Sequence, residues 1–353
     1  MLIVVAFCIY KSSPYTSVVF CNKKTTSHRN IKEFLRKHGS LAPNRYNYSD
    51  VKIMTNSFRH KLGQGGYGSV YEGRLHDGRN VAVKVLTEST GNGEEFINEV
   101  ASISRTAHVN IVTLLGYCFE GHRRALIYEF MSNGSLEKFI DKKNPLKSKT
   151  LYQIAIGIAR GLEYLHRGCS TRILHFDIKP SNILLDEDFC PKISDFGLAK
   201  ICPNKQSIVS MATARGTIGY IAPEVFLRNF GEVSHKSDVY SYGMMVLEMT
   251  GGRHNRNVEV QNTSEIYFPQ WIYKCLEEGE ELGLDCISNE EDKNCTRKMI
   301  TVSLWCIQTN PSDRPTMSRV VDMLKDNLDL LQIPPRPFLS SPSKSMKNLA
   351  SKG

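Results

Sequence analysis

A group of polar residues between two apolar runs has the chemistry needed to move a phosphoryl group. Asp177, Lys179 and Asn182 lie close together in the sequence, and Asp195 follows downstream. Because Pro180 has no backbone donor and disfavours helix at the residue before it, this group is expected on a loop. The carboxylate of Asp177 can orient a hydroxyl and accept its proton, and Lys179 can lie against a phosphate. Asn182 and Asp195 supply the hard oxygen ligands that suit Mg²⁺.

This spacing alone is weak, because an Asp and an Asn in one turn commonly do no more than cap backbone groups. The flanking runs Arg172–Leu174 and Ile183–Leu185 predict two short strands, with the polar loop at the end of a hairpin-like turn. Further motifs, which occur in order along the chain, favour phosphoryl transfer over the capping interpretation.

The first of these motifs is the glycine pattern formed by Gly63, Gly65 and Gly68. A G-x-G-x-x-G pattern also occurs in dinucleotide-binding folds, but there a helix follows the glycines. Here strand-like sequence follows, and the next apolar run, 81–85, contains Lys84. The glycines would let backbone amides approach phosphates from a hairpin lid, and Lys84 could reach the α and β phosphates.

A helix predicted over residues 94–104 supplies a carboxylate partner for Lys84. Its apolar stripe is formed by Phe96, Val100 and Ile103. Glu99 borders this stripe, so it is a better candidate for the ion pair than Glu94 or Glu95. The alternative is that all three are solvated surface acids.

Two more strands, 111–115 and 125–130, are predicted before a turn or linker at Asn133–Ser135. An adenine ring would bond to backbone between Glu129 and Met131, with Tyr128 at the back of the pocket. The rest of the chain is predicted to be helical, with helices over 151–165, 239–249, 299–307 and 320–331. We expect Asp238, at the start of one helix, to be compensated by backbone amides of the polar loop.

The formal charge of +9 is concentrated in the two flanks. Residues 1–50 hold eight Lys or Arg against two acids, a net +6, and the tail from Ile333 carries +4, which leaves 9 − 6 − 4 = −1 for the middle. A nucleic-acid partner is therefore disfavoured. The ten cysteines are dispersed and are expected to be reduced thiols; a zinc or disulfide site at Cys275, Cys286, Cys295 and Cys306 is disfavoured.

The N-terminal segment admits two interpretations. Met1–Tyr10 is almost wholly apolar, but ten residues cover only about half of a bilayer's hydrocarbon core. With the cations that follow, it looks like the cytoplasmic end of a membrane anchor attracted to anionic lipid. The other interpretation is a solvated leader. Further on, Ser49 is expected to cap a short helix that carries Val51 and leads into the folded domain.

In order, these motifs resemble those of a eukaryotic protein kinase over about Phe58 to Leu331. The matching residues are Gly63-x-Gly65-x-x-Gly68-x-Val70, Lys84, Glu99, His175-x-Asp177-x-Lys179-x-x-Asn182, Asp195-Phe196-Gly197, Ala222-Pro223-Glu224 and Arg314. Arg314 matches the family arginine that pairs with the counterpart of Glu224. The finer resemblance is to plant receptor-like kinases of the leaf-rust-resistance-locus and thaumatin-like receptor kinase group, through Gly216–Glu224, His235–Gly243 and Trp305–Gln308.

The resemblance implies an α+β, two-lobed fold with a small antiparallel β-sheet lobe, one key helix and a larger, mainly helical lobe. It implies transfer of the γ-phosphoryl group of ATP, with Mg²⁺ or Mn²⁺, to protein substrates. Asp177 would deprotonate the acceptor, Lys179 would steady the phosphate, and Asn182 and Asp195 would hold the metal. Nucleotide contacts are expected from Leu62, Gly63, Gly65, Gly66, Gly68, Val70, Ala82, Lys84, Glu99, Tyr128, Glu129 and Met131.

Lys179 and Thr217 favour Ser/Thr over Tyr specificity. Phe176 stands where most kinases carry an Arg that pairs with a phosphorylated activation-loop residue. Since Phe cannot form that pair, we expect activity not to require phosphorylation of Ser207, Ser210 or Thr213.

The expected organisation is an apolar segment 1–10, a basic juxtamembrane-like segment 11–57, a kinase domain 58–332 with lobes 58–131 and 132–332, and a disordered tail 333–353. The resemblance places the kinase domain on the cytoplasmic side of a membrane, the plasma membrane, with association to itself or a co-receptor; a genuinely short N-terminus would make it cytoplasmic. A catalytically silent scaffold is the competing hypothesis, but such proteins usually lack a counterpart of Lys84, Asp177 or Asp195.

Overall fold

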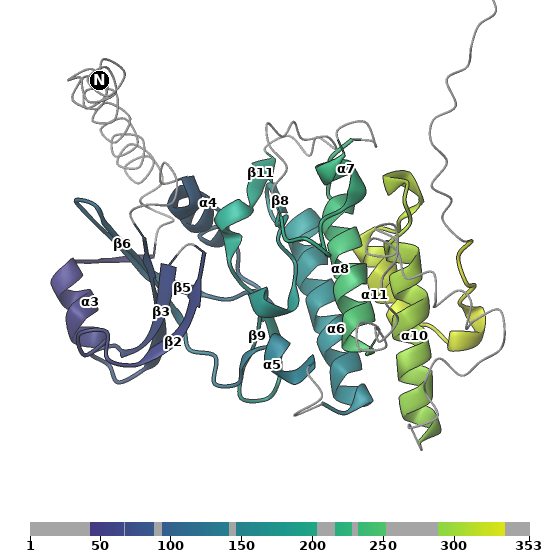
Figure 1. The fold of residues 1–353 in the computed structure, drawn as a ribbon, viewed down its shortest axis with the longest axis horizontal. Coiled ribbons are helices and arrows are strands. Elements are labelled where there is room, and N and C mark those ends of the chain that lie inside the picture. The colour runs from purple at the N-terminus through teal and green to yellow at the C-terminus, as the bar shows by residue number, and fades with distance from the viewer. Residues whose placement is uncertain are drawn as a thin grey trace, which may run out of the picture.

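The chain forms two lobes, one built on a β-sheet and one mainly on helices (Figure 1). The computed structural model describes residues 43–66, 68–87, 94–140, 146–202, 216–227, 232–251 and 289–335. The two-lobed α+β fold expected from the sequence is confirmed. The apolar segment 1–10, the basic segment as far as residue 42 and the tail from 336 lie outside the described residues, as do Ser207, Ser210 and Thr213.

The N-terminal lobe contains a six-stranded sheet with the order β1-β5-β6-β4-β3-β2. Its strands are β1 (Asn44–Tyr46), β2 (Lys61–Gly65), β3 (Gly68–Arg74), β4 (Asn80–Leu86), β5 (Leu114–Glu120) and β6 (Arg123–Glu129). All neighbouring strands are antiparallel except β1, which runs parallel to β5. The antiparallel sheet expected from the sequence is confirmed for β2 to β6, and the parallel edge strand β1 was not predicted.

Alternation along β4 gives the sheet two different faces. Val81 and Val83 are fully buried in an outer core, where α3 (Tyr48–Met54) covers the sheet. Ala82 and Lys84, on the opposite face, line the space between the lobes. This follows from the period of two in a strand, which sends successive side chains to opposite faces.

The helix predicted over 94–104 is α4 (Glu94–Ile103), and its apolar stripe is buried as expected. The expected helix before the sheet is α3, but its N-cap is Asn47 rather than Ser49. The backbone N–H of Asn47 donates to Asp50 Oδ2 at 2.9 Å, and the helix begins at Tyr48, two residues earlier than a cap at Ser49 would place it.

The strand predicted over 111–115 begins only at Leu114, as β5. Before that point the backbone bonds to the other lobe, because Val112 N donates to Ile193 O and Ile193 N donates to Asn110 O. Ile111 makes only an isolated bridge with Ile193. The run predicted as one strand is therefore divided: Leu114 and Leu115 belong to β5, while Ile111 and Val112 are buried and join the lobes.

The second lobe is built on α6 (Ser148–Glu163), α8 (Lys236–Met249), α10 (Glu290–Cys306) and α11 (Met317–Lys325), with short helices α5 (Glu137–Ile140) and α7 (Pro223–Phe226). A π-helical turn, Tyr164–Gly168, continues α6. α8 is buried nearly all round, as its composition predicts, and Tyr242 donates to Ala155 O on α6 at 3.0 Å. The predicted helix 320–331 ends at Lys325, and a 3-10 turn, Leu328–Leu330, follows it.

The expected hairpin-like turn around the polar loop is wrong. β8 (Arg172–Leu174) pairs with β11 (Lys200–Cys202), while β9 (Ile183–Leu185) pairs with β10 (Pro191–Ile193) and with β7 (Gly134–Ser135). The residues expected to form a plain turn at 133–135 thus include a short strand. The two runs that flank the polar loop each find their partners elsewhere in the sequence.

The cysteines within the described ranges are free thiols, and Cys295 and Cys306 are among them. Cys275 and Cys286 lie outside the described residues. No helix in the described part of the chain is both long and apolar enough to cross a bilayer.

Candidate active site

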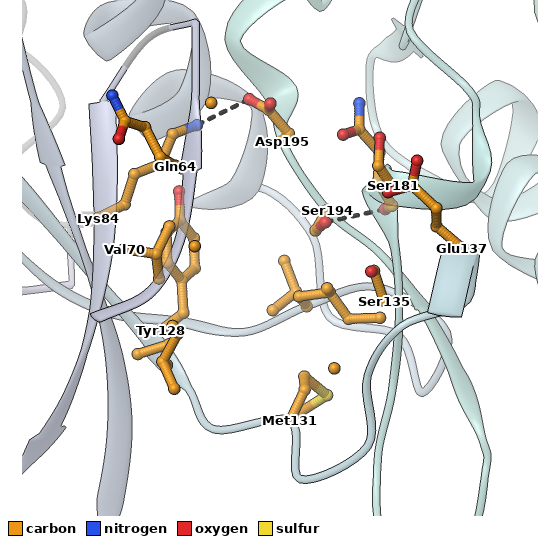
Figure 2. Close-up of a pocket in the computed structure, with 18 of the residues that line it drawn as sticks. Gln64, Val70, Lys84, Tyr128, Met131, Ser135, Glu137, Ser181, Ser194 and Asp195 are labelled. Carbon is orange, nitrogen blue, oxygen red and sulfur yellow. Dashed lines mark hydrogen bonds and ion pairs between the residues drawn. The ribbon is translucent and has the colours of Figure 1, made fainter. Parts of the chain in front are cut away.

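A cavity of about 490 Å³ lies between the lobes and brings together the residues expected to contact a nucleotide. Figure 2 shows Val70, Lys84 and Tyr128 on the sheet side, Met131 at the connection between the lobes, and Asp195 across from Lys84. This size is typical of sites for drug-sized or cofactor-sized ligands. The lining includes all twelve residues predicted to contact the nucleotide: Leu62, Gly63, Gly65, Gly66, Gly68, Val70, Ala82, Lys84, Glu99, Tyr128, Glu129 and Met131.

The hairpin of β2 and β3 covers one side of the cavity with its glycines. Gly68 is required by close packing, since a Cβ at this position would lie 2.1 Å from the carbonyl oxygen of Val85 on β4. All five residues of β2 are exposed, so few side-chain contacts hold this strand. The hairpin can therefore act as a lid whose backbone approaches a ligand closely.

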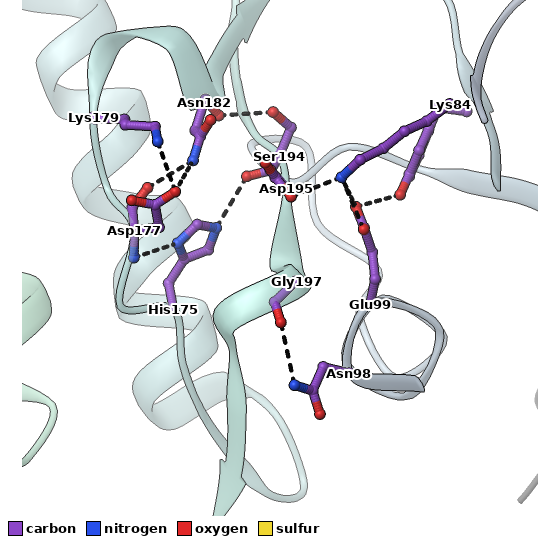
Figure 3. Close-up of polar contacts among 11 residues, drawn as sticks. Lys84, Asn98, Glu99, His175, Asp177, Lys179, Asn182, Ser194, Asp195 and Gly197 are labelled. Carbon is purple, nitrogen blue, oxygen red and sulfur yellow. Dashed lines mark hydrogen bonds and ion pairs between the residues drawn. The ribbon is translucent and has the colours of Figure 1, made fainter. Parts of the chain in front are cut away.

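Lys84 joins the two lobes through two carboxylates. Its Nζ lies 3.0 Å from Glu99 Oε2 on α4 and 2.7 Å from Asp195 Oδ1 (Figure 3). Glu99 is the acid that the helix pattern singled out as the partner of Lys84. Neighbouring Asn98 also donates to Gly197 O at 3.2 Å, so α4 is fastened to the segment that carries Asp195.

The charges of this trio depend on one another. Burial by itself would lower the pKa of Lys84, but the carboxylates of Glu99 and Asp195 outweigh it and raise that pKa. Burial would raise the pKa of Asp195, yet Lys84 holds it below its ordinary value. Burial does raise the pKa of Glu99, although Lys84 opposes the shift. Both Lys84 and Asp195 are thus fixed in their charged forms at neutral pH.

Tyr128 closes the back of the cavity. Its hydroxyl donates to Glu99 Oε1, and burial followed by the Glu99 charge raises the pKa of Tyr128 well above its ordinary value. The next residue, Glu129, turns its side chain away, where Oε1 accepts from Thr113 N at 2.7 Å and lies 3.4 Å from Lys192 Nζ. The backbone N–H of Glu129 donates to Thr113 O at 3.1 Å, and the connection Glu129–Met131 lines the cavity.

Asp177 lies beside this cavity rather than in its lining, with its carboxylate held by three donors. Oδ1 accepts from Thr217 Oγ1 at 2.6 Å, while Oδ2 accepts from Asn182 Nδ2 at 2.9 Å and lies 2.8 Å from Lys179 Nζ. Lys179 Nζ also donates to Thr217 Oγ1 at 2.8 Å. Since Asp177 is only 6% exposed, these bonds fix its orientation.

His175 and Asp238 hold the loop that carries Asp177. Asp238, fully buried at the start of α8, accepts from the backbone N–H of His175 at 2.9 Å and of Phe176 at 2.8 Å. The expectation that loop amides compensate Asp238 is confirmed. His175 Nδ1 accepts from Asp177 N at 3.2 Å, so its Nε2 carries the proton and donates to Ser194 O at 3.0 Å.

Asp238 is further bonded to a histidine that the sequence did not single out. His166 Nε2 lies 2.9 Å from Asp238 Oδ2, and both side chains are buried. Burial would raise the pKa of Asp238, but this bond and the loop amides hold it below its ordinary value. His166 precedes β8 on the π-helical turn, where only its helical spacing from the apolar residues of α6 suggested an inward position.

The donor set suits a divalent cation bound together with phosphates. Asn182 and Asp195 both line the cavity. The side-chain amide of Asn182 is oriented by two hydrogen bonds that its Nδ2 donates to Asp177 O and Oδ2, each at 2.9 Å. An amide oxygen and a carboxylate are the kind of ligands that Mg²⁺ takes, with waters and phosphate oxygens completing its shell. Within the described ranges no cluster of three or more His, Cys, Asp or Glu side chains is suited to a metal.

Several lining residues were missed from the sequence. They include Val112, Ser132, Ser135, Glu137, Lys138, Ser181, Leu184 and Ser194. Leu184 had a usable signal, because it alternates with buried Ile183 and Leu185 in β9 and so points to the opposite face. The serines lie on connections, on the two-residue strand β7 or on a single 3-10 turn, which are too short for a periodicity to predict the direction of a side chain.

A glycine-covered sheet above a helical lobe, with a lysine, two acids and an amide converging between them, defines a nucleotide-dependent phosphotransferase. The comparison with protein families agrees, since residues 57–324 match the family described as "Protein kinase domain". The chain belongs to this family, whose members in general use ATP and a divalent metal.

Curated relatives are plant receptor-like kinases. The chain is 60% identical over 309 residues to the PR5-like receptor kinase of Arabidopsis thaliana, covering 86% of this chain and 46% of that protein. It is 54% identical over 339 residues to the leaf rust 10 disease-resistance locus receptor-like protein kinase-like 2.1 of Arabidopsis thaliana (94% and 53%). It is 55% identical over 325 residues to the rust resistance kinase Lr10 of Triticum aestivum (90% and 51%). The chain thus spans about half the length of these relatives.

Proposed function

We propose that this chain is an ATP-dependent Ser/Thr protein kinase that acts in receptor-like signalling. The observation that carries the proposal is the convergence of Lys84, Glu99 and Asp195 in a cavity whose edge is formed by Asp177 and Asn182. Positioning and electrostatic stabilisation account for most of the catalysis of phosphoryl transfer, and this arrangement offers both.

The residues can be assigned roles from their contacts. Asp177, held by Thr217, Lys179 and Asn182, would orient the acceptor hydroxyl and take its proton. Lys84, with its charge fixed by Glu99, would bind the nucleotide phosphates and would release Asp195 to a metal. Mg²⁺, held by Asn182 and Asp195, would neutralise charge on the phosphates.

Two hydrogen bonds of Thr217 support Ser/Thr specificity: its hydroxyl donates to Asp177 and accepts from Lys179. Because the Thr217 hydroxyl lies 2.6 Å from Asp177 Oδ1, an acceptor hydroxyl would reach Asp177 beside it, and we infer a short path to the base. A short path suits the reach of Ser or Thr, whereas a phenol needs its hydroxyl several ångströms further from the backbone.

The position of Phe176 supports activity without the phosphate-dependent ion pair common in kinases. Its side chain is 5% exposed and packs with Leu174 and Cys202, against Val233. It thus fills an apolar cluster and offers no group to a phosphate. This is consistent with an active loop that does not depend on Ser207, Ser210 or Thr213, which lie outside the described residues.

The names of the relatives, which refer to disease or rust resistance and to receptor-like kinases, support a role in defence signalling. We infer from this likeness to receptor-like kinases that the kinase domain lies on the cytoplasmic side of the plasma membrane. We extend that role to this chain as part of the proposal, together with protein substrates and association with itself or a co-receptor. The basic residues upstream of Pro43 would suit the cytoplasmic face of an anionic bilayer.

Phosphoamino acid analysis tests the proposal. The full chain, incubated with ATP, Mg²⁺ and a mixed protein acceptor, should yield phosphoserine and phosphothreonine in large excess over phosphotyrosine. Lys84→Met should reduce incorporation by about 100-fold or more. The matched control is Lys149→Met, at an exposed lysine of α6, which should leave incorporation unchanged. Equal incorporation by wild type and Lys84→Met would reject the site, and mainly phosphotyrosine would reject the specificity.

A further inference from the structure

The segment before the kinase domain match is fastened to the outer face of the sheet, and we call residues 44–58 the N-terminal clasp. β1 pairs in parallel with β5, with Asn44, Arg45 and Tyr46 opposite Gly116, Tyr117 and Cys118. Val51 of α3 is fully buried in the outer core beneath the helix. Figure 1 shows α3 lying against the sheet on the side away from the second lobe.

Gly116 shows how closely the clasp is fitted. A Cβ at Gly116 would lie 2.3 Å from the Tyr46 ring and 2.8 Å from Asn44 O, so β5 admits the clasp only with glycine at this position. Without β1, β5 would be the edge strand of the sheet. Docking of the clasp therefore gives the outer backbone groups of β5 hydrogen-bond partners.

Polar contacts hold the clasp to the turn between β5 and β6. Tyr48 N donates to Glu120 Oε2 at 2.8 Å, and Arg45 donates to Phe119 O at 3.2 Å. The guanidinium of Arg123 lies 4.2 Å from the centroid of the Tyr48 ring, within the range of a cation–π contact. The clasp is therefore fixed by burial, strand pairing and charge.

The end of the clasp is a strained turn. Asn56, Ser57 and Phe58 have φ values of 46°, 57° and 63°, in the left-handed region that side chains disfavour. Thr55, 1% exposed, donates to Val51 O at 2.7 Å and accepts from Phe58 N at 3.2 Å. Such strain persists only where surrounding structure imposes it, and here α3 and the sheet are that structure.

This turn leads directly into β2, the first strand of the glycine lid. Phe58 packs on Tyr48 and on Tyr71 of β3, with ring centroids 5.9 and 5.2 Å apart. Glu72 N then donates to His60 O at 2.9 Å, immediately before β2 begins at Lys61. Because β2 is exposed along its whole length and pairs only with β3, its position depends on how the chain enters it.

We propose that the N-terminal clasp is a positioning element for the glycine lid, so that its docking sets the affinity of the site for ATP. The proposal rests on the proposed function. It predicts that the domain needs residues 44–56, which precede the family match at residue 57. Release of the clasp would free the turn at Asn56–Phe58 from its imposed conformation, and β2 would lose its fixed entry.

The test compares two substitutions on one helix of the full-length chain. Val51→Asp places a charge in the outer core, whereas Ile53→Asp adds the same charge at a position that is 67% exposed. We expect Val51→Asp to raise the KM for ATP about fivefold, with kcat changed less than twofold, because a looser lid weakens nucleotide binding in general. Hydrogen exchange at residues 61–70 should quicken. Ile53→Asp and the conservative Val51→Ile should match wild type in the ATP KM and in hydrogen exchange at residues 61–70.

If Val51→Asp does not fold, Tyr46→Ala, at a half-buried position, provides the same comparison. An unchanged ATP KM and unchanged exchange at residues 61–70, in a folded variant whose residues 44–55 exchange faster, would overturn the proposal. A wild-type chain that transfers no phosphate would instead refute the proposed function. In that case the exchange of the lid still decides whether the clasp positions it.

Discussion

Replacing Arg314 should destabilise the second lobe more than any surface substitution. Arg314 is 1% exposed and is held by Glu224 through two bonds, Nη1 to Oε1 at 2.7 Å and Nη2 to Oε2 at 2.8 Å. It also donates to three carbonyl oxygens, those of Gln308, Lys236 and Thr309. The pair expected from the sequence is thus present, buried and fully bonded.

The magnitude follows from what Arg314→Met leaves behind. Glu224 would remain as a buried charge, and among the described residues Ser237 Oγ, at 2.8 Å, would be its one remaining side-chain donor. Breaking a buried ion pair by removing one partner costs about 3–5 kcal/mol. At roughly 2–4 °C per kcal/mol for a domain of this size range, the melting temperature should fall by about 6–20 °C.

Thermal denaturation of the full chain measures this effect. The matched control is Arg319→Met, which removes an exposed arginine that lies 3.4 Å from Asp326. An exposed pair contributes at most about 1 kcal/mol, so the control should melt within a few degrees of wild type. Adding Glu224→Gln to Arg314→Met should recover part of the loss, because the unpaired charge is removed. Equal melting temperatures for Arg314→Met and Arg319→Met would refute the reasoning.

Three further predictions concern the site and its support. Glu99→Gln should lower kcat/KM for ATP by about 10-fold or more in steady-state assays, because Lys84 loses a buried counter-charge; near-wild-type kinetics would contradict this. Gly68→Ala should lower the melting temperature and raise the ATP KM, since its Cβ meets backbone atoms of β4, whereas a Cβ at Gly63 meets no protein atom within 4 Å, so Gly63→Ala should leave the melting temperature unchanged. Burial lowers the pKa of His235 from 6.5 to about 4, so the unfolded chain binds the extra proton between these values. The free energy of unfolding should therefore fall as pH decreases from 6.5 toward 4, and it should fall less steeply in a His235→Gln variant. Equal pH dependence of the free energy of unfolding in wild type and variant would contradict this prediction.

Local patterns predicted the parts of the site that one element determines. Lys84 follows from strand alternation in β4, and Glu99 from its spacing to Phe96 and Ile103 in α4. In each case a fixed period decides the direction of a side chain. The roles of these residues came from the order of the motifs, and the structure adds the distances between them.

Strand pairing could not be predicted in the same way. The runs at β8 and β9 were recognised as strands, and β9 pairs with nearby β10 in a local hairpin. β9 also pairs with distant β7, however, and β8 pairs with β11, beyond Asp195. Pairing across such separations depends on the packing of the whole lobe and not on local propensity. For the same reason β1 escaped notice, since its contacts with β5 are made by three residues without an alternating pattern.

The central claim is that Asp177 serves as the base for phosphoryl transfer while other residues bind the nucleotide. The most direct measurement is the steady-state rate of peptide phosphorylation by Asp177→Asn, with Asp188→Asn, at an exposed acid of the same lobe, as control. We predict that Asp177→Asn lowers kcat by about 100-fold or more and leaves the ATP KM within about twofold, since Asp177 is outside the cavity lining. A folded Asp177→Asn variant that keeps more than about a tenth of the wild-type rate would contradict the claim.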